Sequence, residues 1–391
     1  MNLNILFKVV FWRGLTAILS FLTMFYCMKN MSVYDFADYS FAFTIYTAFA
    51  LIPGMGINNQ VALDNQNVEL IEKNNNVKIY FLLIILVIFG AYACSLIENI
   101  VFYAMIGGIA SSIFDYFLVV LQAKKSFIKY SLFMPVKTTI ILAIVFLTST
   151  YLKEAEVQLI FKNIAIIFMI FYIVFVLFKI NLHTFDLKYN FSIYKDGFSF
   201  FVFDICAMLM MRAEVWILSL YSGLINLPKE NIANYWAAFN FIMIVSIMGS
   251  TLANLVLPYI KESAESNFSK LNILIRKVII IMFALLIISS LASYIASTCF
   301  LSSSYKMLPY YVLSLGIGVF FAFLANIERL KLMGYGSKGI DKIVINQFLI
   351  SIICNLIFIF IFGIWGAVLT FIIVRLYSYL SFSKKVKVLM S

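Results

Sequence analysis

Stretches of about twenty apolar residues recur along the whole chain, and about twenty residues of helix cross roughly 30 Å of hydrocarbon. Twelve such stretches can be placed. They are residues 5–28, 34–56, 79–97, 100–121, 131–151, 158–180, 198–221, 232–256, 278–300, 307–327, 343–362 and 364–380. Their apolar residues do not alternate with a period of two, as the strands of a membrane β-barrel require. The pattern predicts an all-α integral membrane protein with about twelve transmembrane helices.

The composition excludes a water-soluble fold. The chain is 64% hydrophobic and only 12% charged, whereas about 25% of the residues of soluble domains are charged. The charged residues that are present give a net charge of +11. Because basic segments next to a membrane are attracted to anionic lipid, this charge predicts membrane lipid as a partner and requires no nucleic acid.

Basic residues are concentrated in the loops on one side of the predicted spans. Nineteen lysines and arginines fall in the loops that join even to odd spans and in the C-terminal tail, against five in the opposite loops. The positive-inside rule therefore predicts a multi-pass protein of the cell (inner or plasma) membrane with both termini in the cytoplasm. No basic residue precedes the first apolar stretch and no small-x-small cleavage site follows it, so we expect it to be a retained span.

A seven-residue segment near the start of the second span has a counterpart 196 positions later. Residues 37–43 read Ala-Asp-Tyr-Ser-Phe-Ala-Phe, and residues 233–239 read Ala-Asn-Tyr-Trp-Ala-Ala-Phe. Asn58 and Asn254 are separated by the same offset. The repeat predicts two six-helix lobes, residues 1–180 and 198–391, joined by a cytoplasmic connector at residues 181–197. We expect a pseudo-two-fold axis along the membrane normal, with the substrate path between the lobes.

Three ionisable residues lie deep inside predicted spans. Arg13 is near the middle of the first span, and Arg212 and Glu214 are deep in the seventh. Charges at this depth are costly in lipid, so these side chains should face protein or a wet cavity. Arg212 and Glu214 are two positions apart, about 200° around a helix, so each needs another partner. A guanidinium in a wet cleft suits an anionic substrate, above all a phosphate, whose oxygens match its forked donors.

Two further acidic residues occur within spans. Asp115 shares a helical stripe with Ser111 and Ser112 in the fourth span, and Asp204 lies early in the seventh. Each acid is either a counter-ion to Arg13 or Arg212, a protonatable carboxylate, or a member of a plain interhelical ion pair. Three other basic residues lie closer to cytoplasmic ends, where long side chains reach the interface. These are Lys8, Lys137 and Arg375.

The chain carries no recognisable catalytic motif. Its only histidine, His183, lies in a predicted loop, and no metalloprotease, serine-hydrolase or nucleotide-binding signature is present. The five cysteines show neither a disulfide framework nor a metal-binding spacing. The predicted outer loops are short, which disfavours a membrane polysaccharide polymerase or transferase. We therefore expect a transporter rather than an enzyme, with no cofactor and no metal site.

Four segments resemble the polysaccharide-lipid flippases. Residues 34–39, Tyr-Asp-Phe-Ala-Asp-Tyr, followed by Gly-Met-Gly-Ile-Asn at 54–58, resemble the second span of that family. Residues 211–218 resemble its seventh span, although Glu214 stands where the family has Asp. Residues 233–238 resemble its eighth span, with Ala233 in place of the usual Gly, and Gly-Ile-Trp-Gly-Ala at 363–367 resembles the start of its last span. The chain is thus similar to Wzx-type O-antigen flippases of the multidrug/oligosaccharidyl-lipid/polysaccharide (MOP) exporter superfamily.

The resemblance implies a MATE-like fold and a flippase for an undecaprenyl-pyrophosphate-linked oligosaccharide, working by alternating access and coupled to an ion gradient. Other glycan-assembly membrane proteins would be its partners. Expected substrate-binding residues are Arg13, Arg212, Asn58 and Asn254, and expected ion-coupling residues are Asp115, Asp204 and Glu214.

Four alternatives to a lipid-linked oligosaccharide flippase stay open, one of them a non-transporting scaffold, which would not explain the deep charges. A cation-coupled drug or metabolite exporter of the same superfamily would prefer an acid-lined cavity, which the deep arginines do not favour. A major-facilitator transporter would carry a basic Gly/Asp motif after the second span, where residues 59–64 read Asn-Gln-Val-Ala-Leu-Asp. A membrane polysaccharide polymerase or transferase is disfavoured by the short outer loops.

Overall fold

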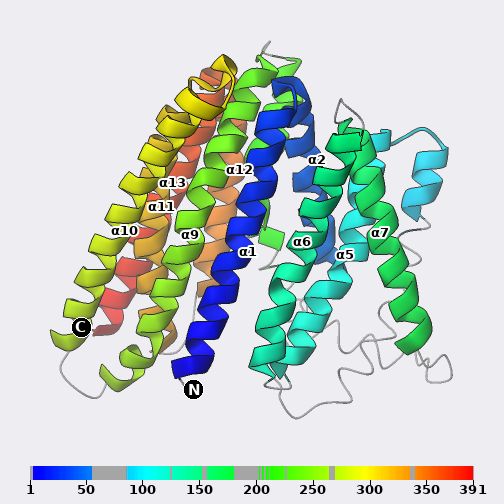
Figure 1. Ribbon diagram of the computed structural model, residues 1–391. Helices are drawn as coiled ribbons and strands as arrows, with labels where there is room; N and C mark the ends of the chain where they lie inside the picture. Colours follow the sequence, from blue (N-terminus) through cyan, green and yellow to red (C-terminus); the bar gives the residue numbers. More distant parts are fainter. Residues whose placement is uncertain are drawn as a thin grey trace. The chain divides into compact units, whose positions relative to one another are not determined.

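The computed structural model describes residues 3–54, 85, 87–123, 126–151, 156–179, 202, 205–206, 208–210, 212–224, 227–263, 269–334 and 340–390. The chain divides into two compact units, Met1–Met208 and Leu209–Ser391. The lobe boundary predicted at residues 181–197 lies outside the described residues. All the regular elements of the described residues are helical (Figure 1).

The first unit contains five long described helices. They are α1 (Leu3–Asn30), α2 (Val33–Leu51), α5 (Asn99–Ala123), α6 (Phe127–Tyr151) and α7 (Val157–Lys179). A 3₁₀ turn, Ile52–Gly54, follows α2. The start of α2 is fixed by Ser32, whose hydroxyl accepts a hydrogen bond from the backbone N–H of Asp35 at 3.1 Å. Such a cap satisfies one of the free donors of the first helical turn.

The second unit contains another five long helices and a short helical stretch. They are α9 (Lys229–Ser263), α10 (Ser269–Ile295), α11 (Leu308–Gly334), α12 (Ile340–Phe362) and α13 (Ile364–Met390). Residues 212–222 are also helical. A π-helical turn, Ala296–Phe300, extends α10, and a 3₁₀ turn, Ser303–Tyr305, precedes α11.

The helices confirm the predicted all-α membrane fold. Eight of them are long and apolar enough to cross a membrane among the residues described. The described helices α5, α7 and α12 begin and end within a few residues of the apolar stretches that predicted them. By contrast, α9, α11 and α13 run on past their apolar stretches into basic or polar segments.

The same packing pattern occurs in each unit. In the first, α5 packs against α2 and α7; in the second, α11 packs against α9 and α13. When the helices are numbered by predicted span, the fourth span contacts the second and the sixth. Six spans later, the tenth contacts the eighth and the twelfth in the same way. The sequence repeat therefore coincides with a repeat of helix packing inside the two units.

Glycines permit the close contacts of these central helices. A Cβ added at Gly108 of α5 would clash with the backbone carbonyl of Tyr46 on α2. At Gly318 of α11 it would clash with the ring of Phe371 on α13. Small residues that let helices approach are typical of membrane interfaces, because lipid offers no hydrophobic force that favours helix association.

The turn between α12 and α13 depends on its two glycines. Gly363 has a φ of +57° and donates its N–H to the carbonyl of Ile359 at 2.8 Å, which ends α12. A Cβ at Gly366, one turn later, would collide with the carbonyl of Phe358. The Gly-x-x-Gly segment at 363–366 therefore reverses the chain within a single residue and packs the start of α13 onto the end of α12.

Candidate functional site

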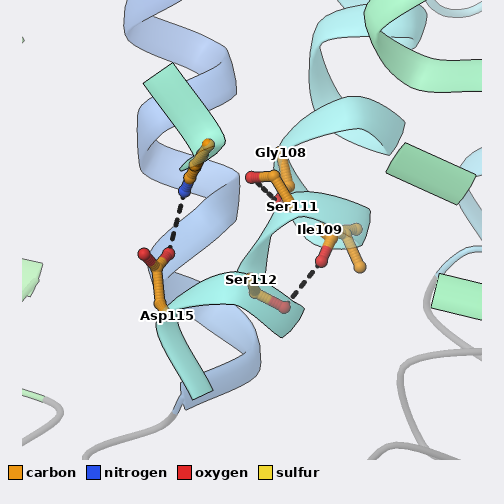
Figure 2. A network of polar contacts seen from close by, with 6 residues as sticks. Gly108, Ile109, Ser111, Ser112 and Asp115 are labelled. Carbon is orange, nitrogen blue, oxygen red and sulfur yellow. Dashed lines mark hydrogen bonds and ion pairs between the residues drawn. The ribbon is translucent and has the colours of Figure 1, made fainter. Parts of the chain in front are cut away.

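An ion pair joins two helices inside the first unit. The Lys137 ammonium on α6 lies 2.9 Å from a carboxylate oxygen of Asp115 on α5. The two side chains are 20% and 40% exposed, respectively. Figure 2 shows the Asp115 carboxylate turned away from α5 toward its partner, while the hydroxyls of Ser111 and Ser112 turn back to their own helix. Asp115 thus has a basic partner of its own within the unit.

A third helix contributes an aromatic residue to this pair. The Lys137 ammonium lies 5.7 Å from the ring centroid of Tyr46 on α2. Tyr46 is buried, at 2% exposure. A cation over an aromatic face gains further stabilisation when water is largely excluded. Lys137 therefore connects α2, α5 and α6 through one ammonium group.

The second unit holds a buried carboxylate with two partners. Glu214, on the helical residues 212–222, is only 2% exposed. The hydroxyl of Tyr235 on α9 donates a hydrogen bond to its carboxylate. Arg375 on α13 interacts with the same carboxylate electrostatically, and its guanidinium lies 5.3 Å from the ring centroid of Phe371. Glu214 thereby interacts with the next helix in the chain, α9, and with the distant helix α13.

Arg212 is held by aromatic rings. Its guanidinium carbon lies 4.9 Å from the ring centroid of Trp236 and 5.9 Å from that of Phe239, both on α9. The two rings are stacked on each other, with centroids 5.6 Å apart. Within the described part of the chain, the structure pairs no carboxylate with Arg212. Cation–π contacts stabilise the charge of the guanidinium, whose N–H donors lie in its own plane.

The structure places these residues as the helical geometry predicted. Arg212 and Glu214 do not pair with each other, because they leave the helix in different directions. Both nevertheless contact the repeated segment at 233–239: Glu214 contacts Tyr235, and Arg212 contacts Trp236 and Phe239. This segment is almost completely buried.

The structure does not test the roles predicted for four other site residues. Arg13 lies on α1 in the first unit and its side chain is exposed. Asn254 lies in α9, but its side chain is outside the described part of the structure. Asn58 and Asp204 lie outside the described residues altogether. The roles assigned to these four residues remain predictions.

Lys137 and Arg375, which were expected to extend toward the cytoplasmic interface, also interact with acidic residues inside their units. Lys137 pairs with Asp115, so the counter-ion of Asp115 is neither Arg13 nor Arg212. Arg375 interacts with Glu214 and is eleven residues beyond the start of the long helix α13. A sequence signal existed for Lys137. It lies in the span that follows Asp115, at a similar distance from the loop that joins the two antiparallel helices.

Comparison with known proteins identifies the fold. No family model and no curated protein sequence matches the chain. The chain shares its fold with solved structures of MOP superfamily membrane transporters. It is similar to a multidrug resistance MATE family transporter in an outward-facing conformation, with 14% identity and a TM-score of 0.62. That match covers 99% of this chain and 96% of the other.

A higher TM-score, 0.73, is found with the lipid II flippase MurJ in an inward closed conformation. The identity is 17%, and the match covers 99% of this chain and 88% of that one. A further MOP superfamily transporter, from Pyrococcus furiosus, matches with 13% identity and a TM-score of 0.52, covering 100% of this chain and 94% of the other. These likenesses show the fold, the multi-pass helical architecture that MATE and MurJ proteins share.

Proposed function

We propose that the chain is a flippase that moves an undecaprenyl-pyrophosphate-linked oligosaccharide, an O-antigen or similar glycan unit, across the inner membrane by alternating access. The shared fold with MurJ and MATE proteins supports a transporter, and the sequence resemblance to Wzx-type flippases supports the substrate class. Other glycan-assembly proteins of the membrane would supply and consume this substrate.

The observation that carries the proposal is the environment of the Arg212 guanidinium. The rings of Trp236 and Phe239 lie within cation–π distance of the guanidinium, and no described carboxylate pairs with it. Cation–π contacts stabilise the guanidinium without neutralising its charge. A pyrophosphate oxygen pair matches the guanidinium fork, which binds such groups through two parallel hydrogen bonds.

The acidic residues of the two units favour an anionic over a cationic substrate. Asp115 has Lys137 as its partner, and Glu214 has Tyr235 and Arg375. A cavity that selects cations needs carboxylates that are not already compensated by fixed basic groups. The rival function, a cation-coupled drug or metabolite exporter, would have to break these contacts to use either acid.

Energy for transport is proposed to come from an ion gradient, with Asp115, Asp204 and Glu214 as coupling residues. In this scheme a proton or sodium ion competes with the internal basic partner of the acid, so that ion binding and helix packing are linked. Arg13, Asn58 and Asn254 would contribute further contacts to the substrate.

The proposal is tested by reconstituting the protein in vesicles that contain a fluorescent polyprenyl-pyrophosphate oligosaccharide, and by measuring the fraction that becomes accessible on the opposite leaflet. Arg212→Ala should abolish translocation in protein that folds normally. Arg212→Lys should restore only part of the rate, because an ammonium keeps the charge without the fork. Normal translocation by a well-folded Arg212→Ala variant would refute the proposal.

A further inference from the structure

The second unit carries an apolar groove that the proposed transport cycle does not use. It lies between α10 and α11, and its volume is about 800 Å³. Small-molecule sites occupy a similar range of about 300–1,000 Å³. The walls come mainly from apolar side chains such as Phe283, Ile287, Leu313 and Ile317, all at least 48% exposed. Gly316 leaves room at the floor of the groove, where a Cβ would lie 3.4 Å from the side chain of Leu286.

The groove lies on a helix whose side chains are mostly exposed. Only 17% of the α10 span is buried, the lowest share among the described candidate spans. Apolar side chains that remain exposed on a membrane helix face the hydrocarbon of the bilayer. The groove is therefore open to lipid, and its occupant must be a molecule that the bilayer supplies.

One end of the groove is polar and positively charged. Among the described residues that line it, Lys306 is the one that is charged, and its side chain is exposed. Tyr294 and Tyr310 lie at the same end and are 59% and 61% exposed. Exposed tyrosines and a lysine are typical of the membrane–water interface. The π-helical turn Ala296–Phe300 is located at this end too, a local irregularity that often accompanies a functional site.

The hydroxyls of the π-helical turn cannot donate to a ligand as they stand. Ser297 and Thr298 both donate to the carbonyl of Tyr294, at 2.9 Å. The ammonium of Lys306, with three N–H donors, is then the principal group that can hold an anion here. The polar end is thus built for a negative headgroup, and the apolar walls for a hydrocarbon chain.

The length of the groove matches one leaflet. Its residues on α11 run from Pro309 to Phe321, which is about 18 Å at 1.5 Å per residue. One leaflet, half of a hydrocarbon core of about 30 Å, is slightly shorter than the groove. An ordinary phospholipid chain anchored at Lys306 would fill this length, whereas a long polyisoprenyl chain would extend well beyond it.

We propose that this groove binds one anionic phospholipid of the surrounding bilayer, with its phosphate at Lys306 and an acyl chain between α10 and α11. In the topology predicted from the basic residues, Lys306 lies on the outer side, so the lipid belongs to the outer leaflet. This inference is independent of the transported substrate, because it concerns only the second unit and its lipid-facing surface.

Native mass spectrometry of the purified full-length protein tests the inference, with phosphatidylglycerol and phosphatidylcholine of identical chains added in turn. The wild-type protein should retain one phosphatidylglycerol in preference to phosphatidylcholine. Lys306→Ala should lower that preference about fivefold, the effect expected of one lysine next to an anionic headgroup. Leu313→Trp, which fills the groove from an exposed position, should weaken retention of both lipids.

Lys29→Ala is the matched control, because Lys29 is an exposed lysine at the end of α1, in the other unit. It should leave the preference unchanged. The inference is overturned if Lys306→Ala behaves as the control does, or if Leu313→Trp retains both lipids as the wild type does. It is overturned equally if the bound mass is a polyisoprenyl phosphate or a second copy of the chain.

Discussion

Tyr39 and Tyr235 occupy the same position in the two helices that carry the sequence repeat. Each is the seventh residue of its helix, α2 or α9, and each is buried. Each hydroxyl interacts with a side chain of the preceding helical segment: Tyr39 with the thiol of Cys27, and Tyr235 with the carboxylate of Glu214. The same tyrosine position is therefore used for a weak contact in one unit and for a strong one in the other.

This difference gives a prediction for stability. Tyr235→Phe removes a donor from a buried carboxylate and should destabilise the protein by about 1–3 kcal/mol. Tyr39→Phe removes only a hydroxyl–thiol contact, so its cost should be smaller. Thermal unfolding of both variants in the same detergent measures the difference. Equal destabilisation would show that the Glu214 contact contributes no more than the Cys27 contact.

The Asp115–Lys137 pair is tested by a double-mutant cycle. Asp115→Asn and Lys137→Met should each destabilise the first unit, and the double variant should be more stable than the sum of the single effects predicts. We expect a coupling free energy of about 0.5–1 kcal/mol, because both side chains are partly exposed and solvent screens their attraction. Additive effects would contradict a direct interaction.

The same two variants separate structural from ion-coupling roles. If Asp115 only stabilises the helix packing, the double variant should keep both stability and gradient-driven transport. If Asp115 carries the coupling ion, the double variant should fold normally but lose the dependence of transport on the gradient. Transport rates measured with and without an imposed gradient distinguish the two results.

The contact between α5 and α2 gives a third stability prediction. Gly108→Ala places a methyl group against the Tyr46 carbonyl and should cost about 1–3 kcal/mol or more, since backbone atoms must shift. Gly14→Ala is the matched control, because no atom lies within 4 Å of a Cβ at that position of α1. It should be neutral or stabilising by up to about 1 kcal/mol. If both variants lose comparable stability, the close approach of α5 to α2 is not the reason that Gly108 is needed.

Orientation in the membrane is tested by reporter fusions. Fusions after Lys129 and Lys387 should report the cytoplasm, and a fusion after Lys229 should report the outside, as the distribution of basic residues predicts. A reversed result at any of these sites would contradict the predicted number of spans.

Hydropathy was sufficient to predict the helices but not all of their ends. α12 ends at its predicted residue because Gly363, with a positive φ, follows at once. α13 continues ten residues beyond the predicted end at residue 380, through Lys384, Lys385 and Lys387. Apolar runs mark the thickness of the hydrocarbon, whereas a helix continues into water wherever its residues have good helix propensity.

The contacts of the site residues were predictable only where the geometry of a single helix determines them. The spacing of Arg212 and Glu214 sufficed to exclude a pair between them, because two positions on a helix point in different directions. The partners of Asp115 and Glu214 were not predicted, since they depend on which helices pack together and at what height. Aromatic stacking of Arg212 was missed for the same reason: Trp236 and Phe239 lie in another helix, and their spacing carries no sign of a cation.

The contacts of Glu214 have a consequence for biosynthesis. During synthesis, Glu214 enters the membrane before either of its partners. Tyr235 follows with the next helix, but Arg375 is made only with the last one. A nascent chain that has not yet reached α13 therefore lacks the guanidinium that acts on this carboxylate. Until then the hydroxyl of Tyr235 is the partner available to Glu214 from the helices already made.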